Sequence, residues 1–317
     1  MSLVLVTGAT GFVGRALCDA LLFRGYAVRA ATRSSVLLPP TIGQIAVGDV
    51  GPHTEWSQAL RGVEAVVHLA ARTHVLNDAA TDALREYRRV NTEGTARLAT
   101  AAARAGVRRF VFLSSIKVNG EATAGQPYTA DDTPHPEDAY GQTKWEAERA
   151  IRGVERHTGM ECVILRPPLV YGPDVKANFL RLMKLVARGV PLPLAAVRNQ
   201  RSMVYLGNLV DALCATVAAP AAAGKTFLVS DGRDLSTPEL VRALAAALAV
   251  RPRLVSVPVP LLAALGGVLG QRREIDRLTK SLQVDSTPLR TELGWQPPHT
   301  IEDGFAKTAA WWRAQNR

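Results

Sequence analysis

The sequence predicts an α/β protein with a doubly wound parallel sheet and a smaller, mixed C-terminal lobe. Short apolar runs alternate with amphipathic helical stretches through residues 1–166, which is the rhythm of repeated βαβ units. A glycine-rich turn separates the first apolar run from the first helical stretch. Beyond residue 167 the alternation weakens and Pro and Gly become frequent, as in "RPPLVYGP" and "RGVPLPL".

The apolar runs of the first half have the length and composition of strands that are buried on both faces. The first of them, "LVLVT", has no polar residue before Thr7. The stretches between the runs carry apolar residues at helical spacing or are rich in alanine. We therefore expect strands at 3–7, 27–32, 44–49, 65–71, 108–115 and 162–167, and helices at 12–24, 82–105 and 140–158.

The second half predicts a lobe that is interwoven with the last strands of the sheet. We expect residues 1–166 and about 204–232 to form the sheet domain, and about 167–203 and 233–317 to form the lobe. Open α/β sheets bind ligands outside the carboxyl ends of their strands, so the lobe would cover the other side of that cleft. Helical patterns in this half occur at 176–188, 207–219, 237–249 and 302–315.

The segment "LVSVPVPLLAALGGVLG" at 254–270 is the longest apolar candidate for contact with a membrane. It is interrupted by Pro258, Pro260 and the pair Gly266-Gly267, and a membrane-spanning helix needs about 20 uninterrupted apolar residues. We expect a strand followed by a buried helix, with contact to a membrane as the alternative. The N-terminus lacks the charged region and cleavage site of a signal peptide. We therefore expect a cytoplasmic protein without stable membrane insertion.

The net charge and the cysteines limit the kinds of ligand and site that the protein can have. The net charge of the 317 residues is +10, but the basic residues are scattered, and no strip of aromatic residues and arginines of the kind that stacks bases occurs. A basic surface with an anionic small-molecule ligand is favoured over nucleic acid. Cys18, Cys162 and Cys214 lie in separate apolar runs and form no metal or redox spacing. We expect buried free thiols in a reducing compartment and no metal site.

The glycine turn "VTGATGFVG" (6–14) predicts a dinucleotide site. It directly follows a strand and opens a helix, which is the context that such glycine patterns require. Gly8 would make the tight turn, Gly11 would let the backbone approach a pyrophosphate, and Gly14 would let the helix pack on the strand. The N-terminus of the helix would then present free N–H groups to the phosphates.

The Gly-x-x-Gly-x-x-Gly spacing, together with "DAYGQTK" (138–144) and "FLSSIKVNG" (112–120), resembles the short-chain dehydrogenase/reductase superfamily. The similarity is to its extended branch, the NAD-dependent epimerase/dehydratase (UDP-glucose 4-epimerase-like) family, whose fold is of the Rossmann type. In that superfamily a Tyr-x-x-x-Lys pair with an upstream serine is the reaction centre. Further segments match the branch in the expected order: "HLAA" (68–71), "VNTEGT" (90–95), "RPPLVYGP" (166–173) and "LGW" (293–295).

The resemblance implies Ser115, Tyr140 and Lys144 as the catalytic residues. Tyr140 would donate or accept a proton at a sugar oxygen, although an ordinary tyrosine pKa is ~10. A nearby ammonium stabilises the phenolate, so Lys144 would lower the pKa of Tyr140 and bind the nicotinamide ribose. Ser115 would hydrogen-bond the reacting oxygen. Asn91 would support the site through backbone geometry, or it would be a structural amide inside a helix.

The end of the second strand bears on the choice of cofactor. NAD-preferring sites usually place an acid there for the ribose 2′-OH, but the sequence has Thr32 followed by Arg33. A guanidinium can grip a 2′-phosphate bidentately. NADP(H) is therefore favoured and NAD(H) is possible, and Asp49 resembles the adenine-contacting acid of the family. The resemblance adds cofactor contacts from Thr10, Phe12, Val13, Val50, Leu69, Ala70, Ala71, Asn91 and Pro167.

The substrate side resembles the nucleotide-sugar clamps of the branch. Asn178, Phe179 and Arg201 would bind a UDP-sugar, with Arg201 paired to its diphosphate. Ile116 and Lys117 stand where family dehydratases carry an Asp-Glu pair, which argues against dehydration. Lys117 would contact a substrate oxygen, or it would be a solvated loop lysine.

Two reactions remain, reduction of a C4 ketone and 4-epimerisation of a UDP-sugar. The segments "SSIKVNGE" and "VKANF" favour the reduction. They resemble bacterial polysaccharide-pathway 4-ketoreductases that form UDP-N-acetylquinovosamine. We expect reduction of the C4 ketone of a UDP-linked 2-acetamido-2,6-dideoxy hexulose. The alternative is a UDP-sugar 4-epimerase with tightly bound NAD, and the remote alternative is a non-catalytic dinucleotide-sensing protein. We further expect a homodimer through helices 82–105 and 140–158.

Overall fold

A computed structural model describes residues 1–73 and 82–316 of the chain. Its main sheet has seven strands in the order β3-β2-β1-β4-β5-β6-β9, and every neighbouring pair is parallel. This confirms the predicted doubly wound α/β fold. The strand order reverses between β1 and β4, which is where such sheets bind ligands. The strands are β1 (Leu3–Thr7), β2 (Ala27–Thr32), β3 (Ile42–Ala46), β4 (Ala65–His68), β5 (Arg109–Leu113), β6 (Glu161–Arg166) and β9 (Thr226–Leu228).

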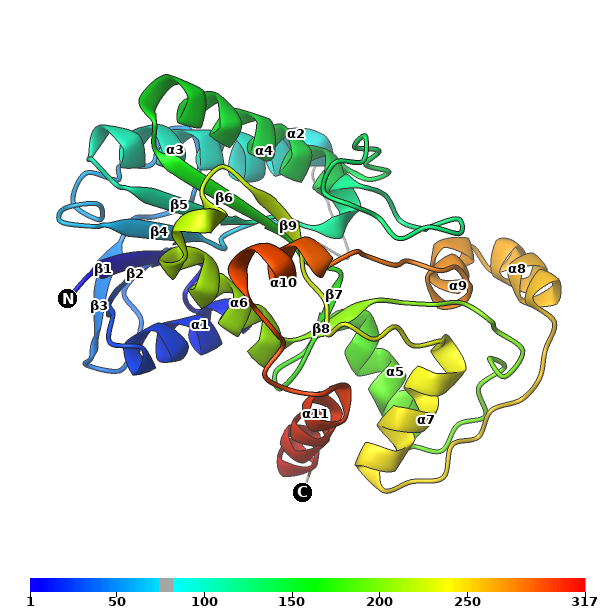
Figure 1. Ribbon diagram of the computed structural model, residues 1–317. Helices are drawn as coiled ribbons and strands as arrows, with labels where there is room; N and C mark the ends of the chain where they lie inside the picture. Colours follow the sequence, from blue (N-terminus) through cyan, green and yellow to red (C-terminus); the bar gives the residue numbers. More distant parts are fainter. Residues whose placement is uncertain (74–81, 317) are drawn as a thin grey trace.

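Helices cover both faces of the sheet (Figure 1). On one face lie α1 (Phe12–Phe23) and α6 (Leu206–Ala218), and on the other lie α3 (Gly94–Arg104) and α4 (Ala139–Thr158). Each face has its own apolar cluster of buried side chains. The strands therefore bury both faces, which explains why they read as continuous apolar runs.

The helix predicted at 82–105 is in fact three consecutive pieces. It consists of α2 (Ala83–Tyr87), a π-helical segment at Arg88–Glu93 and α3. The predicted long helix is therefore confirmed as a continuous helical run, and the π-helical segment within it is what the sequence did not indicate. The π-helical turn places Asn91 inward, and such turns occur frequently at functional sites.

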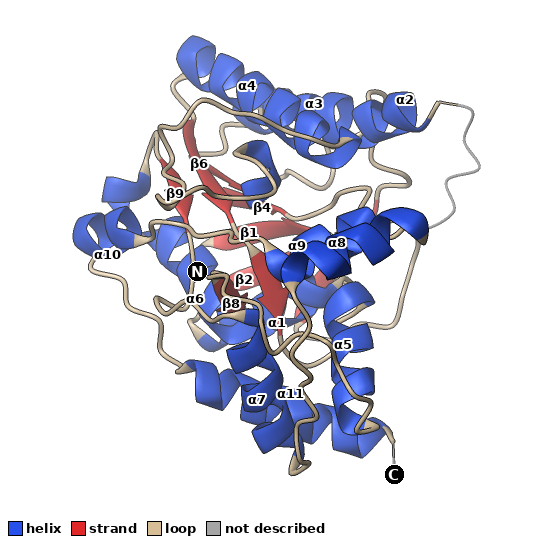
Figure 2. Ribbon diagram, turned by 90° about the vertical axis from the view of Figure 1, so that its right-hand side faces the viewer, coloured by secondary structure: helices blue, strands red, loops and turns tan. Residues whose placement is uncertain are grey.

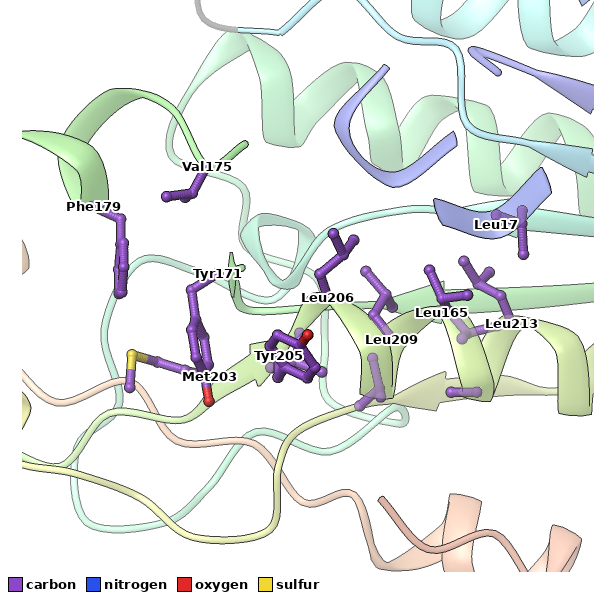
Figure 3. Close-up of a cluster of buried hydrophobic side chains, with 14 of the residues drawn as sticks. Leu17, Leu165, Tyr171, Val175, Phe179, Met203, Tyr205, Leu206, Leu209 and Leu213 are labelled. Atoms are coloured by element: carbon purple, nitrogen blue, oxygen red, sulfur yellow. The ribbon is translucent and has the colours of Figure 1, made fainter. Parts of the chain in front are cut away.

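The second lobe is built on a parallel pair of short strands, β7 (Leu169–Tyr171) and β8 (Met203–Tyr205). Its core is continuous with the core beneath the sheet, running from Leu17 and Leu213 to Tyr171 and Phe179 (Figure 3). The lobe is therefore packed firmly on the sheet domain. Its helices are α5 (Ala177–Ala187), α7 (Thr237–Leu248), α8 (Val259–Val268), α9 (Arg272–Thr279), α10 (Thr287–Leu293) and α11 (Ile301–Gln315). Short 3₁₀ turns occur at Ile116–Val118 and Pro220–Ala222.

The expectation for residues 254–270 is wrong in both parts. Instead of a strand, Leu254 makes only an isolated bridge to Leu192. The helix forms as α8, but it is not buried, because Leu265 is 50% and Val268 is 86% exposed. The sequence shows that the segment is apolar but not what covers it.

The structure also bears on the expectations about membrane insertion and about the cysteine thiols. Among the described residues, no helix is both long enough and apolar enough to span a bilayer. Cys18, Cys162 and Cys214 are buried free thiols, as predicted.

Candidate active site

The glycine turn lies at the carboxyl end of β1, at the point where the strand order reverses. Gly8 has a φ of +67°, and a Cβ there would lie 2.9 Å from the backbone nitrogen of Ala70 at the end of β4. Gly14 lies against the turn, since its Cβ would come 2.1 Å from the carbonyl oxygen of Gly8. These two positions therefore require glycine, for backbone conformation and for close approach.

The N-terminus of α1 is available to an anion. The residue before the helix is Gly11, which offers no side-chain cap, so the first N–H groups of the helix keep their hydrogen-bonding capacity. Thr10 and Gly11 are exposed, while Phe12 and Val13 are half-buried beside them. This arrangement fits the pyrophosphate of a dinucleotide.

Gly14→Ala is expected to lower the free energy of unfolding by about 3 kcal/mol, because the added methyl group overlaps the turn. It should also abolish thermal stabilisation by NAD(H) or NADP(H). Gly153→Ala in α4 is the matched control, since no atom lies within 4 Å of its Cβ position, and it should stabilise the helix slightly. Equal stability of the two variants in urea unfolding would contradict this assignment.

A buried network that the sequence analysis missed holds the ends of β1 and β4 together. The imidazole of His68 bonds Thr7 Oγ1 at 2.6 Å through Nδ1 and Thr95 Oγ1 at 2.9 Å through Nε2. Burial lowers the pKa of His68 to about 3, so the ring is neutral. Thr7 Oγ1 also accepts the N–H groups of Leu69 and Ala70, each at 3.2 Å. The network fixes the predicted cofactor segment 69–71 beside the glycine turn.

Asn91 is a clamp between two loops of the site. Its Oδ1 accepts the N–H of Arg72 at 2.8 Å, and its Nδ2 donates to the carbonyl of Arg72 at 3.1 Å and to Thr143 Oγ1 at 3.1 Å. The side chain is buried, with 1% exposure. Asn91 therefore joins the segment after β4 to the N-terminal part of α4.

The predicted adenine side of the cofactor site lies at the ends of β2 and β3. Arg33 is exposed, and its Nε lies 2.7 Å from Oδ1 of Asp49, which is also exposed. Val50 is half-buried and packs close to Gly94, whose Cβ would lie 2.7 Å from Val50 Cγ1. No carboxylate stands on β2 itself, so the guanidinium of Arg33 is the charged group nearest the end of that strand in sequence.

The three predicted catalytic residues come from two elements that pack together. Ser115 follows β5 and caps the 3₁₀ turn, its Oγ accepting the N–H of Lys117 at 3.2 Å. Tyr140 lies in the first turn of α4, which Asp138 caps by accepting the N–H of Gly141 at 2.7 Å. Lys144 is 2% exposed, and its Nζ donates to the carbonyl of Leu113 at 2.6 Å. Pro167 is buried beside them, its carbonyl accepting the N–H of Ile116 at 3.0 Å.

The expected pKa of Tyr140 needs a correction. Burial raises this pKa above its ordinary range, and Asp138 and Tyr87 add to the effect. Burial also lowers the pKa of Lys144 to about 7, and Glu148 opposes that shift. The ammonium of Lys144 is directed at the carbonyl of Leu113. The protein by itself therefore keeps the phenol of Tyr140 protonated.

A second buried network, also missed from sequence, lies beneath Ser115. Ser114 donates to Glu148, whose carboxylate pairs with Arg166 at 2.6 Å. Arg166 Nη1 also donates to Oδ1 of Asn119 at 3.0 Å. Ser114, Glu148, Arg166 and Asn119 are all nearly inaccessible to solvent. The network joins β5, α4 and β6, and so holds Ser115 against the catalytic helix.

Lys117 is not a solvated loop lysine, because its side chain is only 15% exposed. Its Nζ lies 2.6 Å from Oε1 of Glu121 and also pairs with Asp138. Asp138 is the residue that caps α4. Lys117 therefore connects the loop after β5 to the start of the catalytic helix.

Lys117→Met is expected to lower kcat about tenfold or more by releasing Asp138 and shifting Tyr140, while KM for the substrate stays within a factor of two to three. The matched control is Lys280→Met, which breaks an exposed pair with Asp276 and should change neither constant. A large rise in KM with unchanged kcat would show instead that Lys117 binds the substrate.

The predicted substrate residues divide into three kinds. Phe179 is 3% exposed and stacks on Tyr171 with ring centroids 5.5 Å apart, so its ring lies in the core of the lobe. Asn178 is exposed at the start of α5. Arg201 is partly buried, and its Nη1 donates to the carbonyl of Lys280 at 3.1 Å.

Arg277 is a further cation on the substrate side that the sequence analysis did not identify. Its Nε lies 3.7 Å from Oε2 of Glu121, and both Arg277 and Glu121 act electrostatically on Arg201. Glu121 thus lies among Lys117, Arg201 and Arg277. Three cations therefore surround one carboxylate near the start of the catalytic helix.

Comparison with known proteins agrees with this geometry. Residues 4–230 match the protein family described as "NAD dependent epimerase/dehydratase family". A UDP-glucose 4-epimerase of Vibrio cholerae is 45% identical over 318 residues, which cover 99% of this chain and 97% of the relative. An N-acetyl-α-D-glucosaminyl-diphospho-ditrans,octacis-undecaprenol 4-epimerase of Escherichia coli O157:H7 is 28% identical over 321 residues, which cover 96% and 93% of the two chains.

Solved structures share the fold over the whole chain. The UDP-glucuronic acid 4-epimerase from Bacillus cereus, in complex with NAD, superposes with a TM-score of 0.81 at 21% identity, covering 99% of this chain and 100% of that one. The fold, the glycine turn and the family match agree with one another. The chain therefore belongs to the NAD-dependent epimerase/dehydratase family and is an enzyme that works with a nicotinamide dinucleotide.

Proposed function

We propose that the chain reduces the C4 ketone of a UDP-linked 2-acetamido-2,6-dideoxy hexulose, using NADPH or NADH. The product would be a UDP-N-acetylquinovosamine-type sugar for a bacterial surface polysaccharide. A bound reduced nicotinamide would supply the hydride for sugar C4. The protein supplies the proton for the oxygen, binds the diphosphate and orients the ring.

The end of β2 is the observation that carries this proposal. An epimerase must keep NAD bound through oxidation and re-reduction, and the usual anchor is an acid on the ribose 2′-OH. Here Thr32 ends the strand and is 5% exposed, and Arg33 follows with its side chain 82% exposed. An exposed guanidinium favours a 2′-phosphate. Because β2 has no carboxylate to hold the ribose 2′-OH, the cofactor would be free to leave after each turnover.

The protonation state of Tyr140 also supports reduction of the C4 ketone. Reduction needs a phenol that holds its proton until the oxygen of C4 becomes negative. Burial raises the pKa of Tyr140, which keeps the phenol protonated, and Ser115 Oγ can hydrogen-bond the same oxygen. After the transfer, the buried amine of Lys144 would stabilise the tyrosinate when protonated.

The second candidate is a UDP-sugar 4-epimerase with tightly bound NAD. It is favoured by the 45% identity to the Vibrio cholerae protein, which is named a UDP-glucose 4-epimerase. The same three residues would serve it, with Tyr140 first accepting and then returning the proton. A non-catalytic dinucleotide sensor is less well supported, because Ser115, Tyr140 and Lys144 lie on adjoining elements in a partly or fully buried site.

The test supplies purified protein with the UDP-linked 4-hexulose and either NADPH or NADH. We expect one reduced cofactor to be oxidised per sugar reduced, and no 4-epimer from UDP-glucose or UDP-N-acetylglucosamine when cofactor is withheld. Epimerisation without added cofactor, together with no reduction of the ketone, would overturn the proposal in favour of the epimerase.

The Arg33→Ala variant tests whether Arg33 distinguishes NADPH from NADH. It is expected to raise KM for NADPH roughly tenfold or more, since a charge-assisted hydrogen bond contributes about 1.5–3 kcal/mol. KM for NADH should change little. Equal changes for both cofactors would show that Arg33 does not recognise the 2′-phosphate.

We also propose a homodimer through α2, α3 and α4, which cover the same face of the sheet, and a division of the chain into a cofactor part (1–166 and about 204–232) and a substrate part. Residues 226–228 form β9 of the main sheet, which supports the second segment of the cofactor part. Light scattering of the purified protein tests the dimer, and a monomeric mass would contradict it.

A further inference from the structure

Helix α8 carries an apolar stripe that faces solvent. Leu261, Leu265, Val268 and Leu269 are 51%, 50%, 86% and 69% exposed. Their spacing of four, three and one residues places them on one side of a helix. Single exposed apolar residues are common, but a contiguous stripe of this kind marks an interaction site.

The side of α8 next to the stripe is already packed. Leu262 is 5% exposed, and Gly266 lies against α9, where its Cβ would come 2.6 Å from Ile275 Cγ1. Figure 2 shows α8 and α9 side by side, and Figure 1 shows the pair at the end of the lobe that is farthest from β3. The stripe is therefore held on an anchored hairpin of helices rather than on a loose end.

The surroundings of the stripe are strongly basic. Between residues 251 and 280 the chain has six basic residues and two acidic ones, and none of them lies within α8. Arg272 and Arg273 are the first two residues of α9 and are exposed, and no ion pair between described residues involves either of them. The basic residues are Arg251, Arg253, Arg272, Arg273, Arg277 and Lys280, and the acidic ones are Glu274 and Asp276.

We propose that α8 and the start of α9 dock on the surface of an anionic lipid membrane. An apolar stripe with arginines beside it fits acyl chains below and anionic headgroups above. The ten residues of α8 span about 15 Å, half of a hydrocarbon core, so the helix lies in the interface and does not cross. A second copy of the same basic surface would be repelled.

Docking would also orient the candidate site. Arg277 of α9 lies 3.7 Å from Glu121, and Glu121 pairs with Lys117 beside the catalytic helix. The hairpin is thus in contact with the substrate side of the site. A docked enzyme holds that side close to the lipid surface.

The test is flotation of the full-length protein with two kinds of vesicle, phosphatidylcholine alone and an equal mixture of phosphatidylcholine and phosphatidylglycerol. We expect binding to the anionic vesicles, little binding to the neutral ones, and weakening by salt. The double variant L265E/V268E should lose the binding. R272E/R273E should weaken it about fivefold or more for each arginine replaced.

Phe23→Glu is the matched control, because Phe23 is an apolar side chain that is 93% exposed on α1, away from α8. It should float like the wild type, and thermal stabilisation by NADPH should be the same in all variants. Failure of the wild type to bind anionic vesicles overturns the proposal, as does undiminished binding by both double variants. A concentration-dependent oligomer that L265E/V268E dissolves would assign the stripe to a second copy and overturn it as well.

Discussion

Tyr140→Phe is expected to lower kcat roughly 100- to 10,000-fold, the usual contribution of a positioned acid or base. The variant keeps the ring and loses only the hydroxyl that donates the proton. Because α4 is capped by Asp138 and not by Tyr140, the fold and the thermal stabilisation by nucleotide should be retained. The measurement is steady-state reduction of the 4-hexulose, together with the melting temperature with and without NADPH.

Tyr128→Phe provides the control. Its hydroxyl donates to the carbonyl of Ala122 at 2.6 Å in the loop that follows the 3₁₀ turn, so its loss removes a structural hydrogen bond. We expect a cost of about 1 kcal/mol in the free energy of unfolding and near-normal kcat. Similar kcat values for the two variants would contradict the assignment of Tyr140 as the proton donor.

Lys144→Met is expected to abolish most of the activity and to remove one pH-dependent contribution to stability. Burial lowers the pKa of Lys144 from 10.5 to about 7. Between these two pH values the unfolded chain binds more protons at this group than the folded protein does, so this group makes stability rise with pH. Its contribution is complete above pH 10.5 and is lost as the pH falls through 7.

The size of this effect is measurable by urea unfolding. The difference in free energy of unfolding, wild type minus Lys144→Met, should rise with pH by up to about 1.4 kcal/mol per unit. Between pH 7.5 and pH 9 that amounts to about 2 kcal/mol. The same difference for Lys280→Met, on the exposed pair with Asp276, should stay flat. A flat difference for Lys144→Met would show that its amine is not buried in the folded protein.

Local patterns explain how much of the fold was predictable. The strands of the first half are buried on both faces, so each reads as an apolar run, and the helices on either side bury apolar faces against them. Strands β7, β8 and β9 are only three residues long, which is too short for any period to show. Within the π-helical turn at Arg88–Glu93, Asn91 accepts the N–H of Arg72 and donates to Thr143 Oγ1, and contacts at that sequence separation leave no local pattern.

Helix α8 shows a different limit. Hydrophobicity predicted burial, because an apolar helix usually lies in a core. What it packs against is decided by the fold of the whole lobe, and here only Leu262 and Gly266 are covered. The apolar pattern of α8 therefore identified an exposed apolar surface and not a part of the core.

For the site, residues within one sequence motif were predicted and networks between motifs were not. The glycine turn and the pair Tyr140 and Lys144 each lie within a few residues, so each forms a short motif that could be matched to the resemblance with a known family. The link from Thr7 through His68 to Thr95 and the link from Glu148 to Arg166 join distant segments. The burial of Phe179 was not predicted, because "VKANF" does not tell which side of α5 faces the core.

The most direct test of the account is the nucleotide that freshly purified protein releases on denaturation. An enzyme that exchanges its cofactor at every turnover should release well under one nucleotide per chain, and NADPH should raise its melting temperature more than NADH does. Release of close to one NAD per chain would contradict the proposed ketoreductase. It would identify the protein as an enzyme that retains its cofactor, as the alternative 4-epimerase must.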